Sequence, residues 1–211
     1  MGLKNKKILI TCGPTWVPVD DVRMLSNVSS GSLGQICAKM CRQQGAQVTL
    51  LQGPGTEEFS ITGIRRIKFY FLKELENLLR QELKNKYDIV IHAAAVSDFQ
   101  LKRPFAGKIS SQAKEVTLTL VPTKKLIKII KKLSPGCFLV GFKLEARYHQ
   151  RRLLEAIQKL FKESRCDAVV ANALKPEYRA FIAYKEGERT APVTSRRQLV
   201  QHLIRGLETR L

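Results

Sequence analysis

Short apolar runs alternate along the chain with segments whose apolar residues recur at helical spacing. Helical periodicity predicts one helix over residues 32–44, which ends before Gly45, and another over about 72–84. Near-continuously apolar strands that alternate with helices are typical of a parallel sheet covered by helices on both faces. The apolar runs predict buried strands over residues 7–12, 47–51, 67–70, 87–92, 137–142 and 167–171.

Two segments depart from this rhythm. Residues 115–121 alternate with period two, which predicts a half-exposed strand, and residues 180–184 precede Lys185-Glu186-Gly187 as one arm of a hairpin would. We interpret both as antiparallel additions to the main sheet. No repeat, low-complexity tract or linker divides the sequence, so we predict one domain over residues 1–211 with an α/β, doubly wound parallel sheet.

The composition is that of a globular protein. Of the 211 residues, 44% are hydrophobic and 26% are charged, which argues against a disordered chain. No apolar run reaches the length of a membrane span, and the first apolar stretch is too short for a secretory signal, so we expect a cytoplasmic protein. The cysteines form no C-x-x-C pair and are expected to be buried thiols, namely Cys12, Cys37, Cys41, Cys137 and Cys166.

The chain carries an unusual excess of basic residues. Thirty-seven Lys and Arg against 18 Asp and Glu give a formal charge of +19, which suggests nucleic-acid binding. The basic residues are spread along the chain, however, without a basic tail, a zinc finger or an RNA-binding signature. A positive field also suits a domain that handles phosphates and a carboxylate. On charge alone, both interpretations and a merely solvated surface stay open.

Polar and small residues precede the first predicted helix. Ser29, Ser30 and Gly31 offer hydroxyls and free backbone N–H groups that suit a phosphate, although Ser30 could equally be an N-cap. The dinucleotide fingerprint needs its glycines directly after the strand, whereas about 18 residues intervene here. An ordinary NAD site at this turn is therefore not expected.

Two more segments are candidates for nucleotide chemistry. After the strand at 87–92, small residues allow a ring or ribose to approach the backbone, and Asp98 can accept hydrogen bonds from ribose hydroxyls. Short-chain dehydrogenases have a similar strand end, but their Tyr-x-x-x-Lys is missing, which argues against a reductase. We interpret His92 as a strand-end residue rather than a ligand or base. Lys108, on a glycine-bearing loop, can neutralise a triphosphate or can simply be solvated.

These segments, in this order, resemble phosphopantothenoylcysteine synthetase, the phosphopantothenate–cysteine ligase of coenzyme A biosynthesis. The similarity runs over roughly residues 7–186, and the order of the motifs makes it specific. The motifs are Asp21-Val22-Arg23, Ser26-Asn27-Val28-Ser29-Ser30-Gly31, Ala94-Ala95-Val96-Ser97-Asp98, Gly107-Lys108-Ile109, Val140-Gly141-Phe142-Lys143-Leu144-Glu145 and Val170-Ala171-Asn172.

The resemblance implies a Rossmann-like homodimer with an antiparallel flap and a two-step ligase reaction. The carboxylate of 4′-phosphopantothenate would attack the α-phosphate of CTP or ATP, giving an acyl-nucleotide and pyrophosphate. The amine of cysteine would then displace the nucleoside monophosphate. Mg²⁺ would assist at the phosphates, and no resident metal-binding residues are implied.

The roles of the family's site residues can be transferred to the matching positions of this sequence. The resemblance assigns Asn27 to the acyl intermediate and Lys108 to the flap that stabilises charge at the α-phosphate. It also implies that the site lies at the dimer interface, with Asn27 serving the neighbouring subunit's nucleotide. Arg23 would lie near the dimer contact and the substrate, together with Ser29, Ser30 and Gly31. The nucleotide would contact residues of the remaining motifs, which are Ala94, Asp98, Lys108 and Phe142. In the eukaryote-like pattern, Lys159 on the helix before Asn172 would lie near the phosphates.

Several positions depart from the bacterial pattern. Lys108 is followed by Ile109-Ser110-Ser111 instead of further lysines, and Thr123-Lys124-Lys125 lies in the segment where bacterial members carry Asn-Pro-Asp. These features are similar to eukaryotic members, so the choice between CTP and ATP stays open. No flavin is expected, because no decarboxylase segment accompanies the motifs. A nucleic-acid-binding protein and an inactive homologue remain the alternatives.

Overall fold

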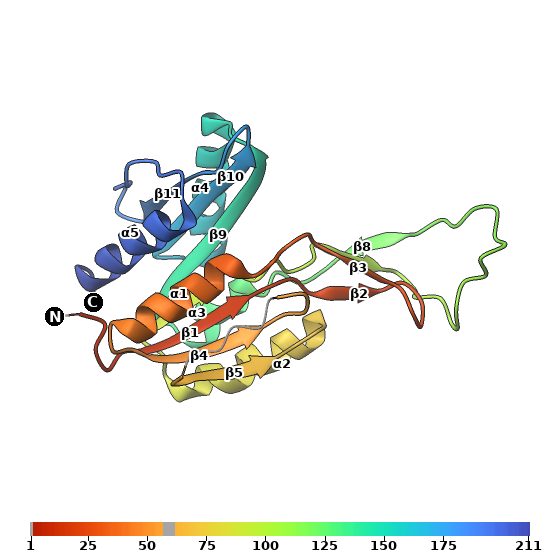
Figure 1. Cartoon of the computed structure of the whole chain (residues 1–211), viewed down its shortest axis with the longest axis horizontal. Coiled ribbons are helices and arrows are strands. Elements are labelled where there is room, and N and C mark those ends of the chain that lie inside the picture. The colour runs from red at the N-terminus through yellow and green to blue at the C-terminus, as the bar shows by residue number, and fades with distance from the viewer. Residues whose placement is uncertain (1, 57–61) are drawn as a thin grey trace.

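The computed structural model describes residues 2–56 and 62–211. Its main feature is a seven-stranded sheet in the order β11-β10-β9-β6-β1-β4-β5 (Figure 1). Neighbouring strands pair in parallel, except that β11 runs antiparallel to β10. The strands are β1 (Lys7–Cys12), β4 (Gln47–Gln52), β5 (Ile64–Lys68), β6 (Ile89–His92), β9 (Phe138–Arg147), β10 (Ala168–Lys175) and β11 (Arg179–Tyr184).

Helices cover both faces of this sheet (Figure 1). One face packs under α1 (Ser32–Gln43) and α5 (Arg196–Glu208) around a cluster of buried apolar residues. The other face packs under α2 (Leu72–Glu82), the 3₁₀ turn η1 (Leu83–Asn85), α3 (Ile127–Leu133) and α4 (Gln150–Ser164) around a second cluster. The prediction of a doubly wound α/β sheet is therefore confirmed.

The central strand β1 shows why its sequence is apolar without alternation. Ile8 and Ile10 belong to the cluster under α1 and α5, whereas Leu9 belongs to the cluster on the opposite face, and all three are fully buried. Helix α1 lies close against this strand, since a Cβ atom on Gly34 would stand 2.5 Å from Cβ of Cys12. The strand and the helix after it are thus fixed together where the strand ends.

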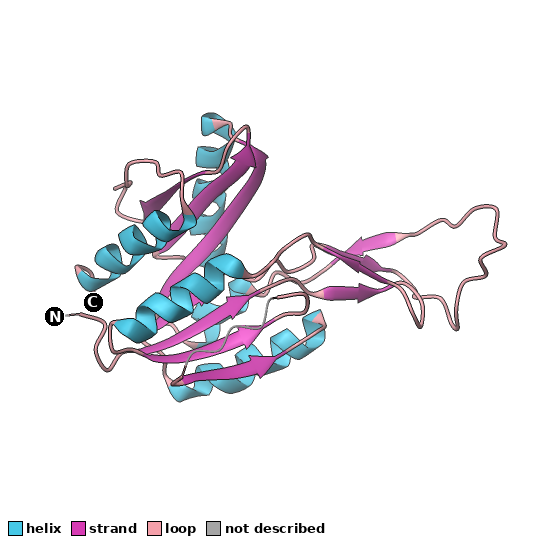
Figure 2. Cartoon of the chain, in the orientation of Figure 1, coloured by secondary structure: helices cyan, strands magenta, loops and turns pink. Residues whose placement is uncertain are grey.

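Four short strands form a projection from the carboxyl end of the sheet (Figure 2). We call residues 16–26 and 99–122 the arm. Its strands pair antiparallel, β2 with β3 and β7 with β8. A long irregular loop, residues 102–119, connects β7 to β8 at the far end. The bounds are β2 (Trp16–Pro18), β3 (Met24–Ser26), β7 (Phe99–Leu101) and β8 (Leu120–Pro122).

The structure corrects two predicted strands. The strand predicted at 115–121 is wrong for most of its length, because residues 114–120 are exposed and only β8 finds a partner, the three-residue β7. The strand predicted at 67–70 is observed as β5, which starts earlier, at Ile64. The strand can include the charged Arg65 and Arg66 because β5 is an edge strand of the sheet. The other predicted strands and helices are confirmed with small shifts at their ends, and the antiparallel addition at 180–184 is β11.

Two further expectations concern burial. All five cysteines are free thiols and buried, as predicted. Across the two described ranges, no helix combines the length and the apolar character that crossing a bilayer requires.

Candidate functional site

A cavity of about 920 Å³ opens at the carboxyl ends of β1 and β6, next to the start of α1. These two strands lie side by side in the sheet, and the chain order reverses between them, since β4 lies beyond β1 and β9 beyond β6. Open α/β sheets bind ligands at this kind of reversal. The cavity extends between α3 and α4, with β9 as its floor.

The segment before α1 forms one end of the cavity. Gly31 is the N-cap of the helix and takes a left-handed conformation with φ of 68°, so Ser30 is not the N-cap. The Ser29 hydroxyl accepts from the Gly31 N–H at 3.4 Å, and the Ser30 hydroxyl accepts from the Ser32 N–H at 3.4 Å. The first turn carries no acidic residue. Its amides and the positive end of the helix dipole therefore favour an anion.

Buried hydrogen bonds hold the end of β6 in place. The Thr11 hydroxyl lies 2.9 Å from Nδ1 of His92 and accepts from the Ala94 N–H at 3.1 Å. Burial lowers the pKa of His92 to about 4, so the imidazole is neutral near pH 7. The Ser97 N–H donates to the Thr15 hydroxyl at 3.0 Å. These contacts explain why His92 is a structural residue, as predicted, and why the backbone from Ala94 onward is well positioned.

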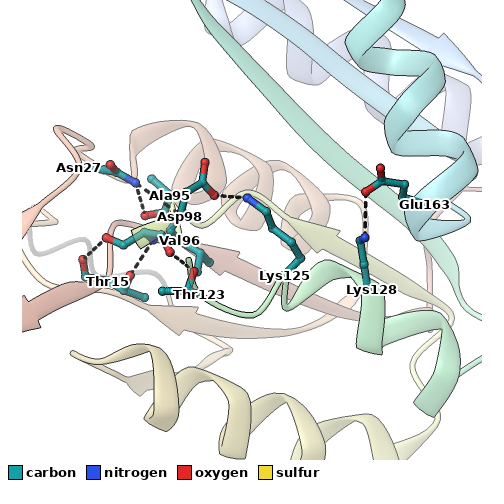
Figure 3. A network of polar contacts seen from close by, with 10 residues as sticks. Thr15, Asn27, Ala95, Val96, Asp98, Thr123, Lys125, Lys128 and Glu163 are labelled. Carbon is teal, nitrogen blue, oxygen red and sulfur yellow. Dashed lines mark hydrogen bonds and ion pairs between the residues drawn. The ribbon is translucent and has the colours of Figure 1, made fainter. Parts of the chain in front are cut away.

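Asn27 and Asp98 meet at this strand end (Figure 3). Nδ2 of Asn27 donates to the carbonyl oxygens of Ala95 at 3.1 Å and Val96 at 3.4 Å. The Asp98 carboxylate pairs with the Lys125 ammonium at the start of α3. Asn27 thus lines the cavity of its own chain, and its expected role toward a neighbouring subunit's nucleotide stays a prediction.

The far end of the cavity lies between α3 and α4. Nζ of Lys128 is 2.8 Å from Oε2 of Glu163, and Nζ of Lys159 is 3.9 Å from Oε1 of the same carboxylate (Figure 3 shows the Lys128 pair). The hydrogen bond from Lys128 is the main reason that the pKa of Glu163 is lowered, and Lys159 and Lys125 add to the effect. Phe142 on β9 also lines the cavity, from the face of the sheet that packs under α1 and α5.

The lining of the cavity is strongly cationic. Six basic side chains face two carboxylates, which leaves a formal charge of +4 for the lining. Of these charged residues, only Asp98 and Lys159 are among the predicted site residues. Lys124 and Lys125 stand where the sequence departs from the bacterial pattern. That departure is the sequence feature from which these two lining residues could have been predicted. The charged lining residues are Lys124, Lys125, Lys128, Lys143, Lys159, Arg196, Asp98 and Glu163.

Two predicted site residues, Arg23 and Lys108, lie outside this cavity. Both are on the arm, where Arg23 pairs with Asp20 and donates to the Ile109 carbonyl at 3.2 Å. The Ile109 N–H donates to Asp20 at 3.0 Å. Although burial opposes it, these hydrogen bonds hold the pKa of the Asp20 carboxyl well below its usual range. The segment that carries Lys108 is therefore fixed to the arm, with the lysine itself exposed.

The structure thus divides the predicted site residues into two groups. The cavity brings together residues from several elements, namely Asn27, Ser29, Ser30, Gly31, Ala94, Asp98, Phe142 and Lys159. The arm holds Arg23 and Lys108. Within the part of the chain that the structure describes, no cluster of three or more His, Cys, Asp or Glu residues could hold a metal ion.

Comparisons with known proteins agree on one family. Residues 3–208 match the DNA/pantothenate metabolism flavoprotein C-terminal domain. The chain is 34% identical over 207 residues to the coenzyme A biosynthesis bifunctional protein CoaBC of Thermococcus kodakarensis, covering 96% of this chain and 51% of that protein. The chain spans about half the length of the curated relatives that it matches.

Solved structures share the fold. The C-terminal domain of a CoaBC protein superimposes with a TM-score of 0.83 at 25% identity, covering 99% of this chain and 96% of that one. A Cab2 mutant solved in complex with phosphopantothenate-cysteine gives a TM-score of 0.80 at 19% identity, covering 98% and 87% of the two chains. At this identity the second similarity concerns the fold alone.

Proposed function

The chain belongs to the DNA/pantothenate metabolism flavoprotein C-terminal domain family, and from that premise we propose that it is a phosphopantothenate–cysteine ligase. Residues 1–211 would form one ligase domain. The observation that carries the proposal is the shared cavity, in which an anion-binding helix start, Asp98 and the amide of Asn27 lie together. The 34% identity to the coenzyme A biosynthesis bifunctional protein CoaBC of Thermococcus kodakarensis supports the same substrate class.

The first step would join the substrate carboxylate to the α-phosphate of a nucleoside triphosphate. A phosphate–oxygen bond to pyrophosphate breaks as the new oxygen–phosphorus bond forms. Negative charge on the transferring phosphate is stabilised by positive groups that are already in place, which the cationic lining and the start of α1 provide. Asp98 would accept hydrogen bonds from the ribose, once Lys125 moves its ammonium away.

The second step would form the amide bond. The cysteine amine attacks the acyl carbon of the acyl-nucleotide. The nucleoside monophosphate leaves and keeps the oxygen that bridged the acyl carbon and the phosphorus. Asn27 suits this step, because its side chain lines the cavity and its Nδ2 could exchange the hydrogen bond to the carbonyl oxygen of Ala95 or Val96 for one to the acyl oxygen. Alignment of the two reactants, rather than a nucleophilic side chain, would supply the rate enhancement.

A divalent cation fits this site as a companion of the triphosphate. The two carboxylates of the lining are each paired with a lysine, and Mg²⁺ is usually bound through phosphate oxygens and water with few protein ligands. Mg²⁺ would neutralise phosphate charge when bound. The lysines around the cavity would then hold the remaining charge, with CTP or ATP as the co-substrate.

We also propose that the protein acts as a homodimer whose arms pair. Most of the large apolar side chains that are exposed in the described residues lie on the arm or beside it, including Phe99, Phe105 and Leu120. Contiguous exposed apolar surface is typical of an interface. Because Lys108 lies on the arm and outside the cavity of its own chain, pairing of two arms is the arrangement that would bring it to a nucleotide.

The test is pyrophosphate release by the purified chain with 4′-phosphopantothenate and Mg²⁺, comparing CTP with ATP, with and without cysteine. We expect release that depends on phosphopantothenate, and amide product only when cysteine is present. A folded sample that releases no pyrophosphate with either nucleotide would refute the ligase proposal. In that case, binding to nucleic acid at several salt concentrations would test the alternative suggested by the +19 charge.

A further inference from the structure

The residues that face the cavity follow an order along its length (Figure 3). Asn27 and the start of α1 lie at one end, Asp98 lies in the middle, and the Lys128–Glu163 pair lies at the other end, between α3 and α4. A nucleotide has its phosphates and its base on opposite sides of the ribose. If phosphates lie at the start of α1 and the ribose at Asp98, the base therefore lies beside Lys128 and Glu163.

This end of the cavity has apolar walls suited to a flat ring. Ile127 from α3 and Leu160 from α4 line it, whereas Phe142 on β9 lines the cavity from the opposite face of the sheet. The strand has no side chain at Gly141, where a Cβ atom would stand 3.0 Å from Cδ2 of Leu160 and 3.1 Å from Cδ1 of Ile127. The two helices thus close tightly over the strand, and the Lys128–Glu163 pair stands on their cavity side.

The carboxylate of Glu163 retains a free hydrogen-bond acceptor. Oε2 is bound by Lys128 at 2.8 Å, whereas Nζ of Lys159 stands 3.9 Å from Oε1, beyond hydrogen-bond distance. The hydrogen bond from Lys128 and the charges of Lys159 and Lys125 keep the carboxyl ionised near pH 7 by lowering its pKa. An ionised carboxylate only accepts hydrogen bonds, and an ammonium only donates them.

A second polar group at this end also lacks a partner. Ser164 lines the cavity directly after Glu163, is 2% exposed, and its hydroxyl has no hydrogen-bond partner among the described residues. Buried hydroxyls in folded proteins are normally hydrogen-bonded, and an exception calls for an explanation such as a ligand. A polar atom of a bound base would satisfy it.

We propose that Glu163 and Lys128 read the edge of the base and select cytosine or adenine over uracil or guanine. Cytosine and adenine each present an exocyclic amino donor beside a ring-nitrogen acceptor, which matches a carboxylate beside an ammonium. Uracil and guanine present a carbonyl oxygen beside a ring N–H at the same positions. The carbonyl oxygen would then face the Glu163 carboxylate, acceptor against acceptor, and the ring N–H would face the Lys128 ammonium, donor against donor. This inference rests on the proposed nucleotide site and deepens it.

The substitution Glu163→Gln tests the inference directly. A glutamine amide can turn to present either its N–H₂ or its oxygen to the exocyclic group, and loss of the carboxylate frees the Lys128 ammonium to move away from a ring N–H, so the variant accepts both kinds of base edge. In the unmodified chain we expect CTP to bind about 10- to 100-fold more tightly than UTP, and ATP more tightly than GTP, since a hydrogen bond to a charged group is at stake. In Glu163→Gln we expect both ratios to fall to about two- or threefold.

A matched control lies on the same helix. Glu155 is exposed on α4, pairs with Arg151 at 3.1 Å and does not line the cavity. Glu155→Gln removes the same charge and should leave both ratios unchanged. The dissociation constants of the four triphosphates, measured by calorimetry on the full chain with Mg²⁺, provide the readout, and circular dichroism checks folding.

The outcomes separate the two proposals. Discrimination that collapses in Glu163→Gln and persists in Glu155→Gln supports the base-reading pair. Equal binding of all four triphosphates by the unmodified chain, or discrimination that survives in Glu163→Gln, overturns it and leaves the ligase proposal standing. A chain that binds none of the four triphosphates contradicts the ligase proposal itself.

Discussion

The cavity and the arm are built in opposite ways. The cavity is assembled from strand ends and helix starts that are tied to the buried sheet, as the contacts of Thr11 with His92 and Ala94 illustrate. The arm has only a small cluster of its own around Val17, Val19 and Leu101. The cavity is lined by residues that a single chain brings together, whereas the arm presents apolar surface that a single chain leaves uncovered.

This difference assigns the predicted chemistry to two places. The groups that we propose to bind a nucleotide and an acyl group line the cavity, whereas Lys108, the residue proposed to stabilise charge at the α-phosphate, is exposed on the arm. A cavity without the arm would bind its ligands, and the arm would be needed for the reaction. The following predictions test that division.

The largest effect is expected on the arm, from Lys108→Ala. We expect the rate of pyrophosphate release to fall about 10²- to 10³-fold, as when one preorganised charge-stabilising group is removed. Nucleotide affinity and thermal stability should change little, because the Lys108 side chain is exposed and outside the cavity. Lys114→Ala, in the same exposed loop, is the control and should keep normal turnover. Normal turnover in Lys108→Ala would remove that residue from the mechanism.

A smaller and more selective effect is expected in the cavity, from Asn27→Ala. Pyrophosphate release should continue, while formation of the amide product falls about 100-fold, because the amide that holds the acyl group is lost. Rapid quenching and mass spectrometry would detect the accumulated acyl-nucleotide. Ser26→Ala, one residue away at the end of β3, serves as the control. Loss of pyrophosphate release in Asn27→Ala would contradict this assignment.

The third effect concerns the free energy of unfolding of the chain rather than the rate of the reaction. Because burial lowers the pKa of His92 from 6.5 to about 4, the unfolded chain binds a proton between these pH values and the folded chain does not. The free energy of unfolding should therefore fall as pH drops from 7 to 4, by about 3 kcal/mol from this residue.

Urea unfolding of the unmodified chain and of His92→Leu at pH 7, 5.5 and 4 measures this contribution. We expect the unmodified chain to lose more stability than the variant over this range. Equal losses in the two proteins would show that His92 does not titrate as its burial requires. We expect the arm to contribute nothing to this pH dependence of stability, because His92 lies in the sheet.

Much of the cavity could be predicted from the sequence, because strand ends determine it. The apolar runs locate β1 and β6, and the residues that follow each run must then meet at the edge of a parallel sheet. Ala94 and Asp98 were found in this way, whereas Asn27 was found through the family resemblance, which also gave the roles. Lys128 and Glu163 were missed because their positions depend on how α3 and α4 pack, which no local pattern encodes.

The arm was harder to predict for a related reason. Residues 115–121 have the alternation of a strand, but a strand also needs a partner, and β7 offers only three residues. Arg23 and Lys108 could be recognised as family residues, but their contacts with Asp20 and Ile109 could not be inferred from spacing. Local sequence specifies strand propensity, whereas pairing depends on segments that are distant in the chain.

The most direct test of the account asks whether the cavity of one copy is completed by the arm of another. Lys108→Ala and Asn27→Ala are each expected to form little amide product alone. In an equimolar mixture that has exchanged subunits, half of the dimers are mixed, and one site in each mixed dimer has both intact residues. We predict that product formation recovers to about a quarter of the unmodified rate. A mixture no more active than the mean of its two components would contradict the account.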